Sequence, residues 1–83
     1  MYSLIYTGTA KKQLKKLNRE TKERIITVLE RCRIRPYAHV ARIVGDKSYR
    51  LRVGKYRMII DILDNKLIIL VLKIDHRKRV YKN

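Results

Sequence analysis

The sequence predicts a small α+β domain, in which a two-helix hairpin packs on a twisted, mainly antiparallel sheet in the order β-α-α-β-β-β. Three features indicate this fold: an early segment with helical spacing, a proline that stops it, and three apolar runs separated by turn residues. With 46% hydrophobic residues the chain is too apolar to be disordered. At 83 residues it forms one domain, 1–83, and buries about 60–65% of its unfolded surface.

The first two elements are a strand and a helix. Residues 2–6 are rich in aromatic and aliphatic side chains, which favours a strand. The break that follows contains Thr9, which we expect to cap the first helix. Leu14 and Leu17 keep helical spacing, and lysines fill the rest of the wheel.

A second helix follows directly and completes an antiparallel hairpin. Asn18 is a suitable N-cap, and Pro36 ends the helix, which we expect to run to Cys32 or Arg33. Residues 36–47 then cross to the sheet, with a short extended piece at 41–44. The expected buried stripe of the second helix is Ile25, Val28, Leu29 and Cys32.

Three strands complete the domain as an antiparallel meander. They are expected at Tyr49–Val53, Tyr56–Leu63 and 67–74, separated by the turn residues Gly54-Lys55 and by residues 64–66. From residue 58 on, the middle strand is apolar on both faces. Helices should therefore cover one face, and something else part of the other.

The hairpin formed by the strands expected at 49–53 and 56–63 can gather three arginines on one face. A two-residue turn at Gly54-Lys55 places Arg52 opposite Arg57, and Arg50 joins them by the period of two. Like charges opposite each other destabilise a sheet, so the cluster favours a bound polyanion. A merely solvated strand face is the alternative.

Composition agrees with an anionic partner. The chain has 22 Lys+Arg against 7 Asp+Glu, a net charge of +15, which favours nucleic acid or a strongly acidic protein. The single cysteine, Cys32, cannot form a disulfide within the chain, which favours a reducing cytoplasm. No signal peptide and no membrane-spanning run is apparent, so we expect no membrane association.

The segment Asp75-His76-Arg77-Lys78-Arg79-Val80-Tyr81 adds three cations, a histidine and a tyrosine after the last strand. Together with Arg50-Leu51-Arg52-Val53-Gly54-Lys55-Tyr56-Arg57, and in the same order along the chain, it makes the sequence resemble the RelE branch of the RelE/ParE toxin superfamily. The resemblance covers nearly the whole chain.

The resemblance implies the toxin of a type II toxin–antitoxin system. Such a toxin is a cytoplasmic, ribosome-dependent endoribonuclease that cuts mRNA in the A site and thereby inhibits translation. An acidic RelB-like antitoxin holds it inactive in a hetero-oligomer, and no cofactor is needed. Many relatives carry Lys where this chain has Arg50 or Arg52. By position, the implied catalytic residues are Arg50, Arg52, Arg57, Arg77 and Tyr81, and the residues expected to contact RNA or the ribosome are Lys55, His76, Lys78, Arg79, Lys11, Lys12 and Lys15.

Metal-independent cleavage of RNA uses the neighbouring 2′-OH as nucleophile. It needs a proton acceptor, cations for the phosphorane and a proton donor for the leaving 5′-oxygen. Arginines stay charged and suit only the second role. Proton transfer is left to Tyr81, His76, Lys55, a terminal group, or the ribosomal RNA and substrate. A lone histidine at a strand end is more often a structural hydrogen-bonding residue, and we favour that reading for His76.

Two other functions are compatible with the sequence. A ParE-type toxin inhibits DNA gyrase without being a nuclease and shares the fold. A non-enzymatic nucleic-acid-binding module would need only the positive charge.

Overall fold

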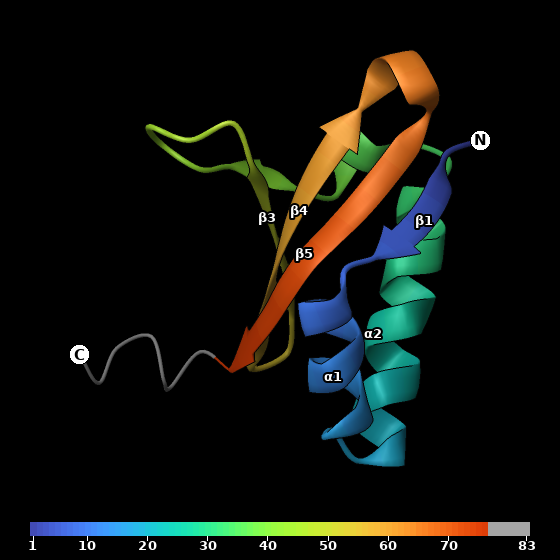
Figure 1. Cartoon of the computed structure of the whole chain (residues 1–83), viewed down its shortest axis with the longest axis vertical. Coiled ribbons are helices and arrows are strands. Elements are labelled where there is room, and N and C mark those ends of the chain that lie inside the picture. The colour runs from blue at the N-terminus through green and yellow to red at the C-terminus, as the bar shows by residue number, and fades with distance from the viewer. Residues whose placement is uncertain (77–83) are drawn as a thin grey trace.

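The computed structural model describes residues 1–76 and confirms the α+β class and the predicted order of elements. Helices α1 and α2 run in opposite directions beside the strands (Figure 1). The short 3-10 turns Pro36–Ala38 and Asp64–Lys66 occupy two of the connections. The elements are β1 (Ser3–Tyr6), α1 (Gly8–Lys15), α2 (Arg19–Cys32), β2 (Ala41–Arg42), β3 (Tyr49–Val53), β4 (Tyr56–Leu63) and β5 (Ile68–His76).

The strands form one mixed sheet in the order β1-β5-β4-β3-β2. The predicted meander of β3, β4 and β5 is confirmed, and all its neighbours are antiparallel. Strand β1 joins the far side of β5 in parallel, with Ser3 opposite Ile68 and Tyr6 opposite Val71. The short strand β2 forms the other edge and keeps only two of the four residues expected at 41–44.

Helix α1 begins two residues earlier than predicted, because Thr7 and not Thr9 is its N-cap. The Thr7 hydroxyl accepts a hydrogen bond from the Ala10 N–H at 3.1 Å and donates one to the Leu72 carbonyl at 2.7 Å. Further along α1, the Gln13 side-chain oxygen accepts a hydrogen bond from the Ile74 N–H at 2.6 Å. Helix α1 therefore continues along β5 where β1 stops, and it occupies the backbone groups that β1 leaves open.

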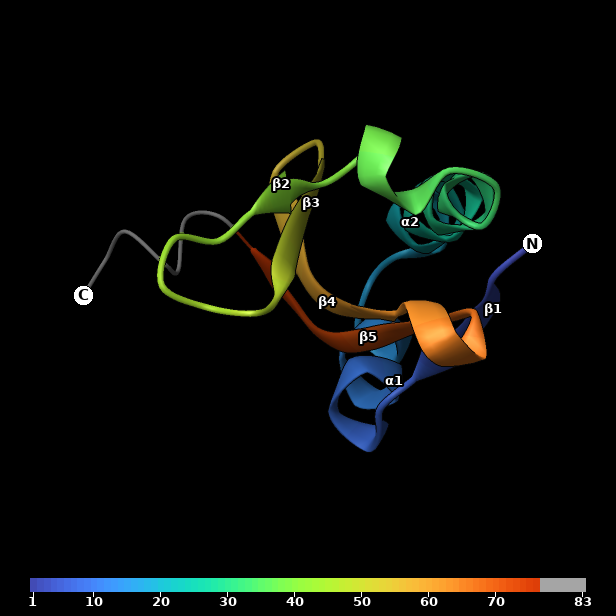
Figure 2. The same ribbon diagram turned by 90° about the horizontal axis from the view of Figure 1, so that it is seen from above.

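Helix α2 supplies most of the helical part of the core. Asn18 caps it as predicted, by accepting from the Thr21 N–H at 2.8 Å. Seen from above, α2 is viewed end-on beside the curved sheet (Figure 2). Three of its four predicted core residues, Ile25, Leu29 and Cys32, are buried, and Val28 packs against them partly buried. Their sheet partners in the same cluster are Leu51, Val53, Met58, Ile60, Ile62, Ile69, Val71 and Ile74.

The two faces of the sheet differ in what covers them. Alternate residues of β3, β4 and β5 enter the core cluster and define the core face. The residues between them define the outer face, which is half-buried or exposed. At the hairpin end the outer face carries arginines. At the other end it carries the apolar side chains of Ile5, Ile59, Leu63, Ile68 and Leu70.

Strand β5 contains a β-bulge that sequence alternation does not reveal. Ile59 lies opposite Lys73 while Ile60 lies opposite Val71, so Leu72 is the extra residue on β5. The Leu72 carbonyl is the group that accepts the Thr7 hydroxyl. Because a bulge exchanges the two faces beyond it, Ile74 points into the core, and Asp75 lies on the outer face.

Asp64 holds three separate segments together at the end of the domain opposite the β3–β4 turn. One carboxylate oxygen accepts from the Tyr37 hydroxyl at 2.6 Å, and the other accepts from the Tyr2 hydroxyl at 2.8 Å. Tyr37 also makes an edge-to-face contact with Tyr49, with ring centroids 5.6 Å apart. Both hydrogen bonds lower the pKa of Asp64, and the bond from Tyr37 has the larger effect. In turn, the hydrogen bond to Asp64 raises the pKa of Tyr37.

The Asp64 cluster should make stability depend on pH at the acid end. The pKa of Asp64 is lowered in the folded state, so its contribution is present above the unfolded pKa of about 4 and is lost as pH falls through the folded value. Asp64→Asn should lower Tm by about a few °C at pH 7. The difference from wild type should shrink below about pH 4. Thermal melts of wild type, Asp64→Asn and a control, Asp61→Asn, between pH 3 and pH 7 test this. A difference that is constant over this range would contradict it.

Candidate functional site

The β3–β4 hairpin has the register that its sequence predicts. Val53 lies opposite Tyr56, Arg52 opposite Arg57 and Leu51 opposite Met58. Gly54 has a φ of 58°, a conformation that L side chains rarely adopt, so a glycine first in a two-residue turn is what this hairpin requires. The turn therefore fixes which face each arginine takes.

Arg50, Arg52 and Arg57 form what we call the arginine face, at the hairpin end of the outer face. Arg52 is exposed, and Arg50 and Arg57 are half-buried. The Nε atom of Arg57 is buried and has no hydrogen-bond partner among residues 1–76. A buried donor without a partner is costly, and a bound oxyanion would supply the missing acceptor.

Asp75 on β5 lies directly beside the arginine face. Its register partner is Arg57, whose partner on β3 is Arg52, so one row across three strands reads Arg, Arg, Asp. Lys73 stands on the same face of β5, and its Nζ is 3.6 Å from the Asp75 carboxylate. Nothing in the hydrophobic pattern marks Asp75, because the bulge that turns it to this face lies within a run of aliphatic residues.

His76 lies on the other face. It is the register partner of Tyr56, and the two rings meet edge to face with centroids 4.9 Å apart. The structure therefore does not bring His76 together with the arginine face. The ring contact fits the structural role favoured for it from the sequence.

Two hollows flank Tyr56 on the helical side of the hairpin. One, of about 310 Å³, is lined by residues at the C-terminal end of α1, including its C-cap Lys16, and by Asp75 and His76 of β5. The other, of about 340 Å³, is lined by the turn residues Gly54 and Lys55 together with Thr21 and Arg24 of α2. The Arg24 guanidinium lies 3.5 Å from the position that a Cβ on Gly54 would take. Lys16 and Arg24 are cations near the hairpin that sequence reasoning missed, since only the fold brings them there.

The other predicted contact residues are distributed over the chain. Lys55 is exposed in the turn, beside the arginines. Lys11, Lys12 and Lys15 are exposed on α1, which packs mainly against β5, so they form a separate basic surface. The remaining predicted residues, Arg77, Lys78, Arg79 and Tyr81, lie outside the described residues.

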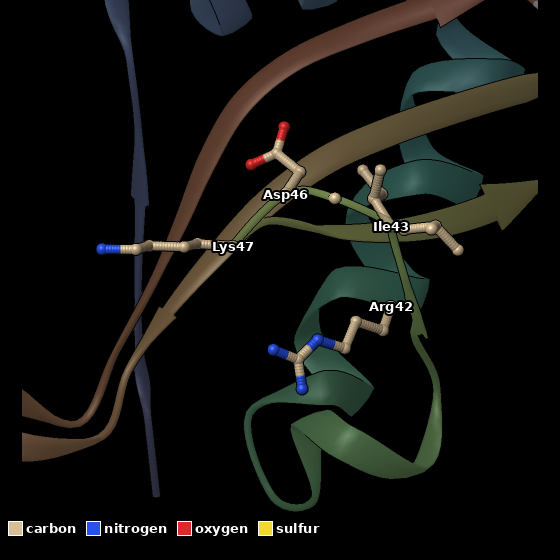
Figure 3. A pocket seen from close by; sticks show the side chains of 6 residues that line it. Arg42, Ile43, Asp46 and Lys47 are labelled. Atoms are coloured by element: carbon tan, nitrogen blue, oxygen red, sulfur yellow. The ribbon is translucent and has the colours of Figure 1, made fainter.

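The loop between β2 and β3 projects away from both helices (Figures 1 and 2). Its residues enclose a hollow of about 390 Å³, and Val44 among them is fully exposed. The side chains of Arg42, Asp46 and Lys47 point in different directions (Figure 3). Because these polar groups do not converge, this hollow lacks the arrangement of a ligand site.

The arginine face can stabilise negative charge but cannot move protons. Within residues 1–76, no group of three or more His, Cys, Asp or Glu side chains is placed to hold a metal ion. The chemistry available is therefore recognition of phosphate by fixed cations, next to one carboxylate.

No helix in this part of the chain is long and apolar enough to cross a membrane.

Comparison with solved structures identifies the fold. The chain is similar to the toxin in the toxin–antitoxin complex RelBE2 from Mycobacterium tuberculosis, with a TM-score of 0.81 and 24% identity, over 92% of this chain and 98% of that one. It is similar to the toxin of the intact E. coli RelBE complex, with a TM-score of 0.80 and 21% identity, over 92% and 96% of the two chains. A RelB–RelE complex from Methanococcus jannaschii matches with a TM-score of 0.74 and 26% identity, over 94% and 95%. The fold is thus that of RelE toxins.

The sequence also assigns a family. The profile described as the ParE toxin of the type II toxin–antitoxin system parDE matches residues 4–81. The chain therefore belongs to this family of type II toxins, within the RelE/ParE superfamily. A search of curated proteins finds none with significant similarity.

Proposed function

We propose that this toxin is a ribosome-dependent endoribonuclease that cuts mRNA in the ribosomal A site by attack of the 2′-OH on the neighbouring phosphate. The arginine face is the observation that supports this most directly. Arg52 and Arg57 are directly opposed, and the Arg57 Nε lacks a partner among the described residues. Such an arrangement is expensive without an anion and well suited to a phosphorane that gains charge in the transition state.

Dependence on the ribosome follows from what the site lacks. The arginine face offers several contacts to phosphate, but the hollows beside the hairpin in residues 1–76 measure only about 310 and 340 Å³, too little to hold a flexible RNA in an attacking geometry. The ribosome would supply this positioning, which can contribute as much to the rate as the catalytic groups themselves. We therefore also propose that the toxin acts in the cytoplasm, where translating ribosomes are found.

The proposed inhibitor is a small acidic, RelB-like antitoxin bound in a hetero-oligomer. Several of the matched structures are toxins solved together with RelB. In this chain, a net charge of +15 and the apolar half of the outer face are both complementary to an acidic polypeptide with an apolar side.

Inhibition of DNA gyrase is the second candidate, because the matched family profile is named for ParE. A gyrase inhibitor would bind a protein surface and would not need opposed arginines aimed at one phosphate.

The two candidates are separated by parallel assays on the same preparation. Primer extension on mRNA translated by purified ribosomes should show new 5′ ends within codons at the A site, whereas naked RNA should be cut weakly or not at all. A gyrase supercoiling assay should be unaffected. Inhibition of supercoiling without new RNA ends would overturn the proposal in favour of the ParE-type activity. Cleavage of free RNA at a rate that ribosomes do not change would refute ribosome dependence.

A further inference from the structure

Asp75 is the one acidic side chain in the row that continues the arginine face onto β5. Only 7 of the 83 residues are acidic, and this one lies where it repels the phosphates that the arginines attract. Its side chain keeps 28% of its accessible surface, so a ligand on the arginine face can reach it. A carboxylate that weakens phosphate binding at this position must contribute to function in another way.

A β-bulge in strand β5 holds Asp75 in this position. The bulge at Leu72 shifts the register of β5, and the Thr7 hydroxyl bonds the carbonyl of the bulged residue. Without the extra residue, alternation would turn His76 toward the arginines and Asp75 toward the core. Bulges commonly re-aim side chains next to active sites.

The proposed reaction needs a proton acceptor, which the arginines cannot provide. A guanidinium is a poor base, so arginines suit phosphate binding and not proton transfer. His76 lies on the opposite face against Tyr56. A carboxylate is ionised at neutral pH and can accept a proton. Asp75 is therefore the group on this face, within residues 1–76, whose chemistry fits the role.

We propose that Asp75 is the general base of the toxin, an inference that rests on the ribonuclease activity proposed above. Its carboxylate takes the proton from the 2′-OH as the 2′-oxygen bonds to phosphorus. The bond from phosphorus to the 5′-oxygen breaks, and that oxygen takes a proton from water. The hydroxide so formed recovers the proton held by Asp75. The products are a 2′,3′-cyclic phosphate and a free 5′-OH.

The charged groups around Asp75 fit this role. Lys73 on the same strand and Arg57 and Arg52 across the sheet face it, while His76 and Lys16 border the hollow on the helical side, which Asp75 also lines. These cations would hold the scissile phosphate beside the carboxylate. Asp75 would then act on the 2′-OH of the same nucleotide.

Three variants at one position, with a matched control, test the inference. Asp75→Asn keeps the shape and removes the charge, and it should slow single-turnover cleavage on ribosomes by about 10²-fold or more. Binding to ribosomes should not weaken, because a negative charge has been removed from a basic face. Asp75→Glu should cleave faster than Asp75→Asn. Added formate should restore part of the activity of Asp75→Ala, because a small carboxylate can fill the space. Asp61→Asn makes the same charge change on the outer face of β4 and should cleave like wild type.

Measuring Tm for every variant shows whether it is folded, so that each result can be interpreted in only one way. If wild type cleaves on ribosomes and Asp75→Asn cleaves within a few-fold of it, Asp75 is not the base, although the proposed function stands. If Asp75→Asn is slow but formate does not rescue Asp75→Ala and Asp75→Glu is no faster, Asp75 has a structural role and the inference is wrong. If wild type leaves translated mRNA intact, the proposed function fails first, and this inference fails with it.

Discussion

Arg57→Ala is expected to slow cleavage of ribosome-bound mRNA by about 10²-fold or more. Removing one preorganised donor to a developing oxyanion typically costs that much, because the donor acts on charge that appears only in the transition state. Arg57 is the arginine for which the structure makes the clearest case, since its Nε is buried without a partner among residues 1–76. Arg77→Ala is expected to behave similarly on the basis of the family resemblance. Single-turnover cleavage with saturating toxin measures the effect.

Lys15→Ala provides the control for Arg57→Ala. Lys15 is exposed on α1, so its loss should produce only a modest, salt-dependent fall in affinity with no change in the saturated rate. Ribosome binding by Arg57→Ala should persist, because many cations remain. If Arg57→Ala and Arg77→Ala both cleave at the wild-type rate while bound, the arginine face is a docking surface and the catalytic assignment is wrong.

Ile60→Ala should have the largest effect on stability. Ile60 is fully buried at the middle of β4, within the cluster that joins α2 to the sheet. Truncating such a residue costs about 2–5 kcal/mol, through lost transfer free energy and the cavity that remains. Small domains have about 5–15 kcal/mol in total, so Tm should fall by about 10 °C or more. Urea unfolding followed by circular dichroism measures the free energy of unfolding.

Ile59→Ala is the matched control for the core substitution. Ile59 is the same residue type one position earlier, on the outer face and only half-buried. It should cost about half as much or less, because less apolar surface is removed from contact and no closed cavity forms. Equal losses for the two variants would mean that the outer face is packed as tightly as the core face.

The hairpin could be predicted from the sequence because its determinants are local. Gly54 fixes the turn, and the alternation on either side then decides the face of each arginine. The cap of α2 was equally local, since Asn18 bonds a backbone group three residues on. At Gly54 and Asn18, neighbours along the chain determine the conformation, and the predictions there were correct.

The rest depended on contacts between distant segments. The Thr7 hydroxyl that caps α1 also donates a hydrogen bond to the Leu72 carbonyl, 65 residues away. No residue near Thr9 indicates this contact. The bulge at Leu72 is invisible in a run of aliphatic residues, because such a run looks alike in either register. The bulge changed which side chain of β5 lies beside the arginines, so the placement of the arginines on β3 and β4 could be predicted from the sequence and the placement of Asp75 on β5 could not.

The parallel pairing of β1 with β5 has a consequence for how the protein is made. Strand β5 lies between β1 and β4 in the sheet, yet it is synthesised after every other described element. Strand β1 must therefore wait for a partner more than 60 residues downstream, since Ser3 pairs with Ile68, and α1 packs mainly against the same late strand. Such non-local pairing folds slowly, and the closing step comes late in synthesis. A nascent chain would thus lack a complete sheet until β5 has been translated, because both β1 and β4 pair with that strand.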